Sequence, residues 1–201
     1  TRKESSAASD VYKRQISGLA LAGLGGLTYA WLNCRKVKIP DYVTAVENFD
    51  PQQYMGKWYE IARLDFKYEK NMSHVTATYF LNKKGVIEVH NRGFDDKENQ
   101  WTEAHGKVKL NGEEGKGALK VSFFGPFYSG YNVVLMDPNY ETALVFGKSH
   151  DYMWILSRQK TISETTKQKF LLYAEEKGYA IEELTWTVQD KVDKYSIISK
   201  G

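Results

Sequence analysis

The residue with the most distinctive chemistry is Cys34, the only cysteine in this 201-residue chain. It lies just after an uncharged, largely apolar run, residues 16–32, which is preceded by Lys13 and Arg14. A basic flank followed by a short apolar run is typical of a secretory signal. A thiol directly after such a run can be acylated once the upstream part is removed. We therefore predict that Cys34 carries a lipid anchor.

Two other interpretations of this leader stay open. The residues before the cysteine are Trp31-Leu32-Asn33, whereas lipoprotein signals resemble Leu-x-Gly/Ala-Cys. Thr28-Tyr29-Ala30 could instead be an ordinary cleavage site, which would give a secreted protein. Residues 16–32 could also remain as a membrane anchor, because seventeen residues are at the lower limit for a span. Cys34 would be an incidental thiol in either case.

Other chemistry has little support in the sequence. A single cysteine excludes an internal disulfide and a thiolate cluster for zinc or iron–sulfur. The four histidines, at positions 74, 90, 105 and 150, lack metal-ligand spacing. No nucleophile elbow, phosphate-binding loop or dinucleotide fingerprint is present. We expect no metal, no cofactor and no enzymatic activity.

The charge distribution divides the chain into a leader and a body. Residues 1–40 contain seven Lys/Arg and two Asp/Glu, whereas the rest contains 21 basic and 23 acidic residues. A nearly neutral body argues against nucleic-acid binding, which depends on contacts to phosphate. The composition, 42% hydrophobic and 14% aromatic, suits one globular domain. We predict a leader and linker at residues 1–40, a domain at 41–190 and a tail at 191–201.

Short alternating runs separated by turn residues predict an all-β domain. The candidate strands are residues 56–66, 73–82, 86–94, 100–110, 117–124, 130–137, 141–147 and 152–158. Eight closely spaced strands with no helices between them suggest a sandwich or a closed antiparallel barrel. One helix follows, with a capping box at Thr161-Ile-Ser-Glu164, or Ser163 as its N-cap, and Gly178 at its end. Residues 183–188 could form a ninth strand.

Several segments together resemble the lipocalins. The stretch from Asn48 to Arg63 contains Gly56-Lys57-Trp58, which is similar to the Gly-x-Trp signature of this family. Asp137-Pro-Asn-Tyr140 resembles the second signature, and Trp154-Ile-Leu-Ser-Arg158 resembles the third. Residues 120–127 and 131–133 look like the bacterial outer-membrane lipoprotein branch, which is similar to apolipoprotein D. The resemblance covers residues 44–188 and has three signatures in the family's order.

This resemblance implies an eight-stranded antiparallel up-and-down β-barrel with one C-terminal α-helix packed outside. Trp58 would close one end of the barrel, with the guanidinium of Arg158 lying across its indole. Gly56 would let the chain pass beneath that end without a Cβ. Asp137 and Tyr140 would be turn and floor residues. These five residues are expected to determine the fold rather than to bind ligand.

Alternation of side chains, started at Trp58 and guided by the family, predicts which residues face the interior. The predicted ligand-binding set is Glu60, Ala62, Ala77, Tyr79, Val89, Asn91, Ala104, Val121, Phe123, Tyr131, Val133, Phe146, Tyr152 and Trp154. Several of these side chains are small, which favours an elongated apolar cavity over a densely packed core. The alternative is a barrel filled by its own aromatic residues, acting as a structural or protein-interaction module.

An apolar tube selects an acyl chain, because each buried methylene contributes about 0.8 kcal/mol. We therefore expect the barrel to bind a fatty acid or a lysophospholipid. Cys34, or an uncleaved anchor, would tether it to a membrane, with the periplasmic side of the outer membrane favoured by Arg35 and Lys36 after the cysteine. The resemblance further implies lipid storage or transfer for membrane maintenance under stress, and a homodimer.

Overall fold

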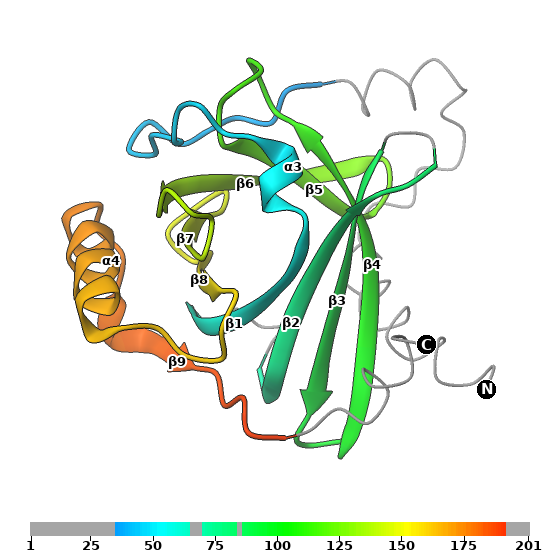
Figure 1. Ribbon diagram of the computed structural model, residues 1–201, viewed down its shortest axis with the longest axis vertical. Helices are drawn as coiled ribbons and strands as arrows, with labels where there is room; N and C mark the ends of the chain where they lie inside the picture. The colour runs from blue at the N-terminus through cyan, green and yellow to red at the C-terminus, as the bar shows by residue number, and fades with distance from the viewer. Residues whose placement is uncertain (1–34, 65–69, 84–85, 192–201) are drawn as a thin grey trace.

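A closed barrel of antiparallel strands forms the centre of the molecule (Figure 1). The computed structural model describes residues 35–64, 70–83 and 86–191, so Cys34, the rest of the leader and most of the predicted tail lie outside the described residues. The strands are β1 (Gly56–Leu64), β2 (Met72–Leu81), β3 (Ile87–Asp95), β4 (Gln100–Leu110), β5 (Ala118–Phe124), β6 (Phe127–Met136), β7 (Thr142–Phe146) and β8 (Met153–Ser157). Each pairs with its neighbour in sequence, and β8 and β2 both pair with β1. The predicted eight-stranded up-and-down barrel is confirmed.

One end of the barrel is closed by the chain that leads into β1. A short helix, α3 (Pro51–Tyr54), crosses this end (Figure 1). Asp50 is its N-cap and accepts a hydrogen bond from the amide of Gln52, while Pro51 occupies the first turn, where no amide donor is needed. Tyr54 is buried beneath the barrel, so this helix fixes one of the floor residues described below.

The C-terminal helix α4 (Glu164–Glu176) packs against the outside of the barrel (Figure 1). Phe170 and Ala174 from this helix share an apolar cluster with the outer face of β1 and β7. Its N-cap is Ser163, which accepts a hydrogen bond from the amide of Thr166. The alternative N-cap considered from sequence is therefore the correct one. Gly178, with a φ of 83°, ends the helix as predicted.

Beyond the helix, a short 3₁₀ turn, η1 (Ile181–Glu183), leads into β9 (Leu184–Trp186), which pairs with the end of β1. This is the predicted ninth strand, shorter than expected. The next residues bridge a gap in the barrel wall, because β1 pairs with β2 only from Gly56 to Tyr59. The amide of Thr187 donates to Ile61 O (2.9 Å), and the amide of His74 donates to Val188 O (2.8 Å). Residues 187–190 thus join β1 and β2 near the open end.

The apolar residues form two separate cores. An inner cluster at the closed end contains Trp58, Tyr79 and Val133, and an outer cluster lies between the barrel and α4. Within the ranges that the structure describes, no helix has the length and apolar character needed to span a membrane.

Candidate ligand-binding site

The barrel encloses a cavity with a volume of about 510 Å³. It extends from the middle of the barrel to the end where β5 meets β6 and β7 meets β8. The lining residues are Glu60, Val75, Ala77, Tyr79, Val89, Asn91, Val121, Ser122, Phe123, Phe124, Phe127, Tyr128, Ser129, Gly130, Tyr131, Lys148, Tyr152, Trp154 and Leu156. Most of the lining is apolar or aromatic, and the volume lies within the range of about 300–1,000 Å³ that small-molecule sites occupy. The expected hollow interior is therefore present.

The structure brings most of the predicted ligand-binding residues together around this cavity. Ten of them are lining residues: Glu60, Ala77, Tyr79, Val89, Asn91, Val121, Phe123, Tyr131, Tyr152 and Trp154. Val133 lies deeper, in the inner core beneath the cavity. Ala104 lies directly opposite Asn91 on the neighbouring strand and shares its face, but it is not part of the lining.

Two predicted lining residues lie on the opposite side of the barrel wall. Ala62 and Phe146 both belong to the outer cluster beneath α4, so the prediction that they face the interior is wrong. In β1, a register shift between Glu60 and Ala62 inserts an unpaired residue, and this reverses the alternation beyond it. In β7, Phe146 pairs with Asn132, whereas Val145 is the partner of the inward-facing Val133. The alternation of side chains along a strand shows neither where the strand bulges nor in which register it pairs with its neighbours.

Part of the mouth of the cavity is formed by residues outside the predicted ligand-binding set. Phe124 and Phe127 face each other across the turn between β5 and β6, and both line the cavity although they are largely exposed. Lys148 lines the cavity from the turn after β7. None of these three residues belongs to the predicted ligand-binding set. A Phe-Gly-Pro-Phe sequence at a hairpin turn, where polar residues are usual, was the signal available.

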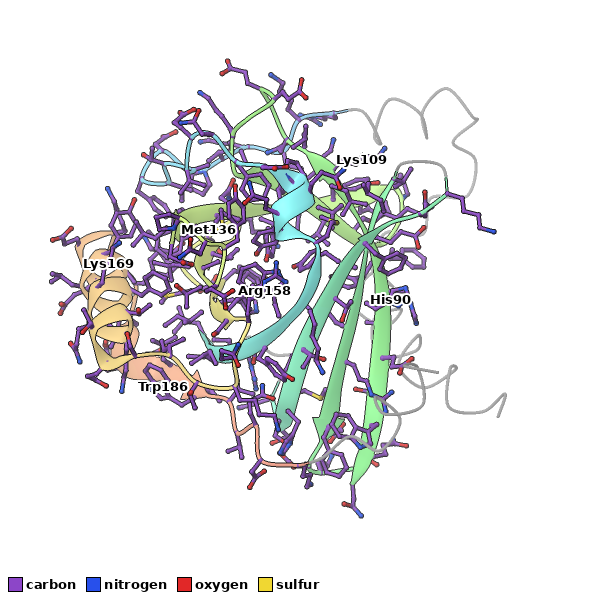
Figure 2. All side chains as sticks on the ribbon, in the orientation of Figure 1. His90, Lys109, Met136, Arg158, Lys169 and Trp186 are labelled. Carbon is purple, nitrogen blue, oxygen red and sulfur yellow. The ribbon has the colours of Figure 1, made fainter. Side chains whose placement is uncertain are left out.

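A sealed layer of aromatic side chains forms the floor. The indole of Trp58 is fully buried and donates its Nε1–H to Tyr54 O (2.9 Å). The guanidinium carbon of Arg158 lies 3.8 Å from the centroid of that indole, near the centre of Figure 2. Arg158 also donates hydrogen bonds to the carbonyl oxygens of Lys57, Gln53, Met55 and Tyr140. The arginine therefore ties the entry helix, β1 and the turn between β6 and β7 together.

The other predicted signature residues occupy turn and floor positions. Gly56 has a φ of 95°, and a Cβ there would lie 3.3 Å from Arg158 Nη1. Asp137 accepts hydrogen bonds from the amides of Asn139, Glu141 and Thr142, which shapes the turn between β6 and β7. Tyr140 adopts a φ of 57°, and its hydroxyl accepts a hydrogen bond from the amide of Asp50.

Comparison with known proteins agrees with this geometry. Residues 49–189 match the profile of the Lipocalin-like domain. The chain is 46% identical over 156 residues to outer membrane lipoprotein Blc of Citrobacter freundii, covering 78% of this chain and 88% of that protein. It is 42% identical over 171 residues to Blc of Escherichia coli K12, covering 85% and 97%. The chain belongs to the lipocalin family.

Among solved structures, the cockroach allergen Per a 4 superposes on this lipocalin with a TM-score of 0.60. That comparison covers 76% of this chain and 94% of the allergen at 19% identity, so it supports the fold alone. The family predicted from the three signatures is confirmed, and lipocalins are binding proteins for small hydrophobic molecules. Among the described residues, no group of three or more His, Cys, Asp or Glu side chains is placed to hold a metal ion.

Polar groups in the wall of this lipocalin are few and mostly paired. Glu60 and Arg63 form a buried ion pair, with Arg63 Nη1 donating to Glu60 Oε1 (2.6 Å). Thr187 Oγ1 donates to the same carboxylate oxygen (2.7 Å), and Arg63 Nη2 donates to Met72 O (3.1 Å). Two other lining residues differ: Asn91 Oδ1 and Ser122 Oγ are buried and have no hydrogen-bond partner. Buried polar atoms of this kind favour a ligand that brings a complementary group.

Three tyrosine hydroxyls meet at the bottom of the cavity. Tyr79 OH donates to Tyr131 OH (2.9 Å), which also lies 2.7 Å from Tyr54 OH. Burial raises the pKa of Tyr79 to about 12 and raises the pKa values of Tyr54 and Tyr131 well above the usual range. The three phenols therefore stay protonated while the barrel is folded, and they join β2, β6 and the entry helix through neutral hydrogen bonds.

This triad predicts a loss of stability in alkali. An unfolded tyrosine releases its proton near pH 10, whereas folded Tyr79 keeps it until about pH 12, so rising pH favours the unfolded chain between these values. Each pKa unit by which folded Tyr79 exceeds an unfolded tyrosine corresponds to about 1.4 kcal/mol, and this amount is lost from the free energy of unfolding as the pH rises through that interval. We expect Tyr79→Phe to flatten this decline, as measured by urea unfolding at several pH values. Tyr59→Phe, outside the barrel, is the control, and an equal flattening there would contradict the assignment.

Proposed function

We propose that this lipocalin binds a single-chain lipid, a fatty acid or a lysophospholipid, in the barrel cavity. The observation that carries this proposal is the apolar cavity of about 510 Å³ that ends on a sealed aromatic floor. The acyl chain would lie along Val89, Val121 and Trp154, with its end near Ala77. At about 0.8 kcal/mol for each buried methylene, a long acyl chain gains enough free energy for micromolar binding after the cost of association.

The polar end of the lipid would lie at the mouth. Lys148 is exposed there and also lines the cavity, so it can pair with a carboxylate or a phosphate. Within the cavity, Asn91 Oδ1 and Ser122 Oγ offer hydrogen-bonding capacity to a hydroxyl or an ester group. Glu60 is already neutralised by Arg63 and does not repel an anionic ligand. No pairing of nucleophile and base is proposed, and the function is one of binding rather than catalysis.

We further propose that the binding domain, residues 41–190, is held at the periplasmic side of the outer membrane through an acylated Cys34. The relatives from C. freundii and E. coli are named outer membrane lipoproteins, which supports this location. In that position the protein would store or transfer lipids for maintenance of the membrane under stress. A homodimer belongs to the same proposal and is tested by light scattering of the purified chain.

Native mass spectrometry tests the ligand. The chain is extracted from bacterial membranes with a mild detergent, and we expect an adduct with the mass of one single-chain lipid. A fluorescent fatty acid should then bind and be displaced by lysophospholipid, whereas a two-chain phospholipid should compete poorly because the cavity cannot hold it. Absence of any lipid adduct, together with no displacement of the probe, would rule the proposal out. The mass of the mature N-terminus reports acylation of Cys34 independently.

A further inference from the structure

The N-terminal end of the described chain is fixed to the barrel wall. Lys120 is 3% exposed, and its Nζ donates a hydrogen bond to Arg35 O (2.8 Å). Two residues later, the amide of Val37 donates to Asn111 Oδ1 (2.7 Å), and Asn111 Nδ2 donates back to Val37 O (2.8 Å). The chain therefore has no free spacer between Arg35 and the barrel. Any membrane attachment at Cys34 or at residues 16–32 would end directly beside β4 and β5.

This attachment point lies on the outer wall of the barrel, and contacts along β5 connect it to the mouth of the cavity. Lys120 Nζ is 5.1 Å from the ring centroid of Tyr128, and Lys109 Nζ is 5.5 Å from the same ring. Tyr128 lines the mouth and directly follows Phe127. A continuous series of contacts thus runs from Arg35 through Lys120 and Tyr128 to the turn between β5 and β6.

That turn carries an exposed aromatic pair. Phe124 and Phe127 face each other across the turn and are 42% and 45% exposed. We call residues 124–127 the mouth hairpin. Large apolar side chains that remain exposed side by side, at the entrance to a cavity, mark a contact surface for another apolar phase. The same two side chains line the cavity, so whatever covers the hairpin also meets the opening.

The charges around the mouth hairpin suit a phospholipid surface. Lys148 lines the mouth, Lys109 lies beside the ring of Tyr128, and Arg35 lies at the attachment point. Aromatic rings at the level of the headgroups, with cations beside them, are the usual composition of a protein surface that lies on an anionic membrane. Figure 2 shows Lys109 on the side of the barrel away from helix α4, which bears Lys169. Lys109 therefore lies on the opposite side of the barrel from the helix.

We propose that the mouth hairpin contacts the phospholipid bilayer to which the chain is attached, so that the cavity opens toward the bilayer. The inference rests on the proposed membrane attachment, and it holds for an acylated Cys34, which directly precedes Arg35, and for an uncleaved apolar anchor, which ends three residues before it. A single-chain lipid would then pass between the bilayer and the cavity past Phe124 and Phe127, without crossing water.

Photo-crosslinking of the attached full-length chain tests this orientation. The photoreactive analogue p-benzoylphenylalanine replaces Phe127, or Leu172 as a matched control, and the chain is reconstituted in vesicles of phosphatidylethanolamine and phosphatidylglycerol. Leu172 is also exposed and apolar, 59% exposed, but it lies on α4. We expect adducts with two-chain phospholipids when the analogue is at position 127. We expect no such adducts when it is at position 172. A two-chain adduct is distinct in mass from a single-chain ligand in the cavity.

The pattern of crosslinks distinguishes the proposed orientation from other arrangements of the chain. Adducts of equal yield at both positions, or none at position 127, would overturn the proposed orientation. Crosslinks from position 127 to a second copy of the chain would also overturn it and would assign the mouth hairpin to a dimer interface. Probe binding by the same preparations is measured in parallel, so failure of the orientation is distinguished from failure of lipid binding. A preparation that does not float with the vesicles would instead contradict the membrane attachment itself.

Discussion

Replacing Ala77 with tryptophan should abolish most of the binding of a fluorescent fatty acid while the barrel remains folded. Ala77 lines the cavity and lies directly opposite Trp58 across the β1–β2 pair, so the new indole would occupy the lower part of the cavity. Displacing only two methylenes of the ligand removes about 1.6 kcal/mol. We therefore expect the dissociation constant to rise at least about tenfold, since a factor of ten corresponds to about 1.4 kcal/mol.

The matched control for this substitution is the next residue on the same strand. Thr78 pairs with His90, and its side chain points to the other face of β2. We expect Thr78→Trp to leave the affinity for the probe within the error of the titration. Ala77→Phe, a smaller change, serves if the tryptophan variant proves unstable. Undiminished binding of the probe by a folded Ala77→Trp variant would contradict the assignment of the cavity as the ligand site. Severe destabilisation by both Ala77→Trp and Ala77→Phe would favour a filled core, which tolerates overpacking poorly.

Replacing Trp58 with alanine should cause a large loss of stability. Its indole is fully buried, packs against Tyr54 at a centroid distance of 4.7 Å and carries the Arg158 guanidinium on its face. Truncation would leave a void at the floor and would remove the surface on which that guanidinium lies. Buried tryptophans cost about 3–5 kcal/mol when they are cut back to alanine. We expect the midpoint of urea unfolding to fall accordingly.

Trp186 provides the control because it also has a cation on its ring. Lys167 Nζ lies 4.4 Å from its centroid, but this indole is 42% exposed on β9 at the outside of the barrel. We expect Trp186→Ala to cost less than about 1 kcal/mol, because a surface cation–π contact contributes only about 0.5–1 kcal/mol. Similar losses of stability in Trp58→Ala and Trp186→Ala would show that closure of the floor does not depend on Trp58.

Local patterns in the sequence were sufficient for the architecture. Alternation in the strands and the three signature segments predicted an eight-stranded barrel closed beneath by Trp58 and Arg158, and the structure contains it. Such features are predictable because they depend on residues close in sequence or on positions that the family's signatures specify. The bridging role of residues 187–190 was not predicted, since it depends on hydrogen bonds to strands that are distant in sequence. The short helix at Pro51 was not predicted either, although its N-cap bond is local.

The lining of the site required the tertiary structure. Alternation placed ten cavity residues correctly but misplaced Ala62 and Phe146, because a bulge in β1 and the register of β7 decide which face each side chain occupies. Phe124 and Phe127 were not predicted as lining residues for a related reason: their side chains meet the cavity because of how β5 and β6 pair at this turn. The sequence by itself determined that this protein is a barrel with an apolar interior. Only the folded chain decided which side chains face that interior and which of them line its mouth, because pairing register and long-range contacts are set by the packing of the whole barrel.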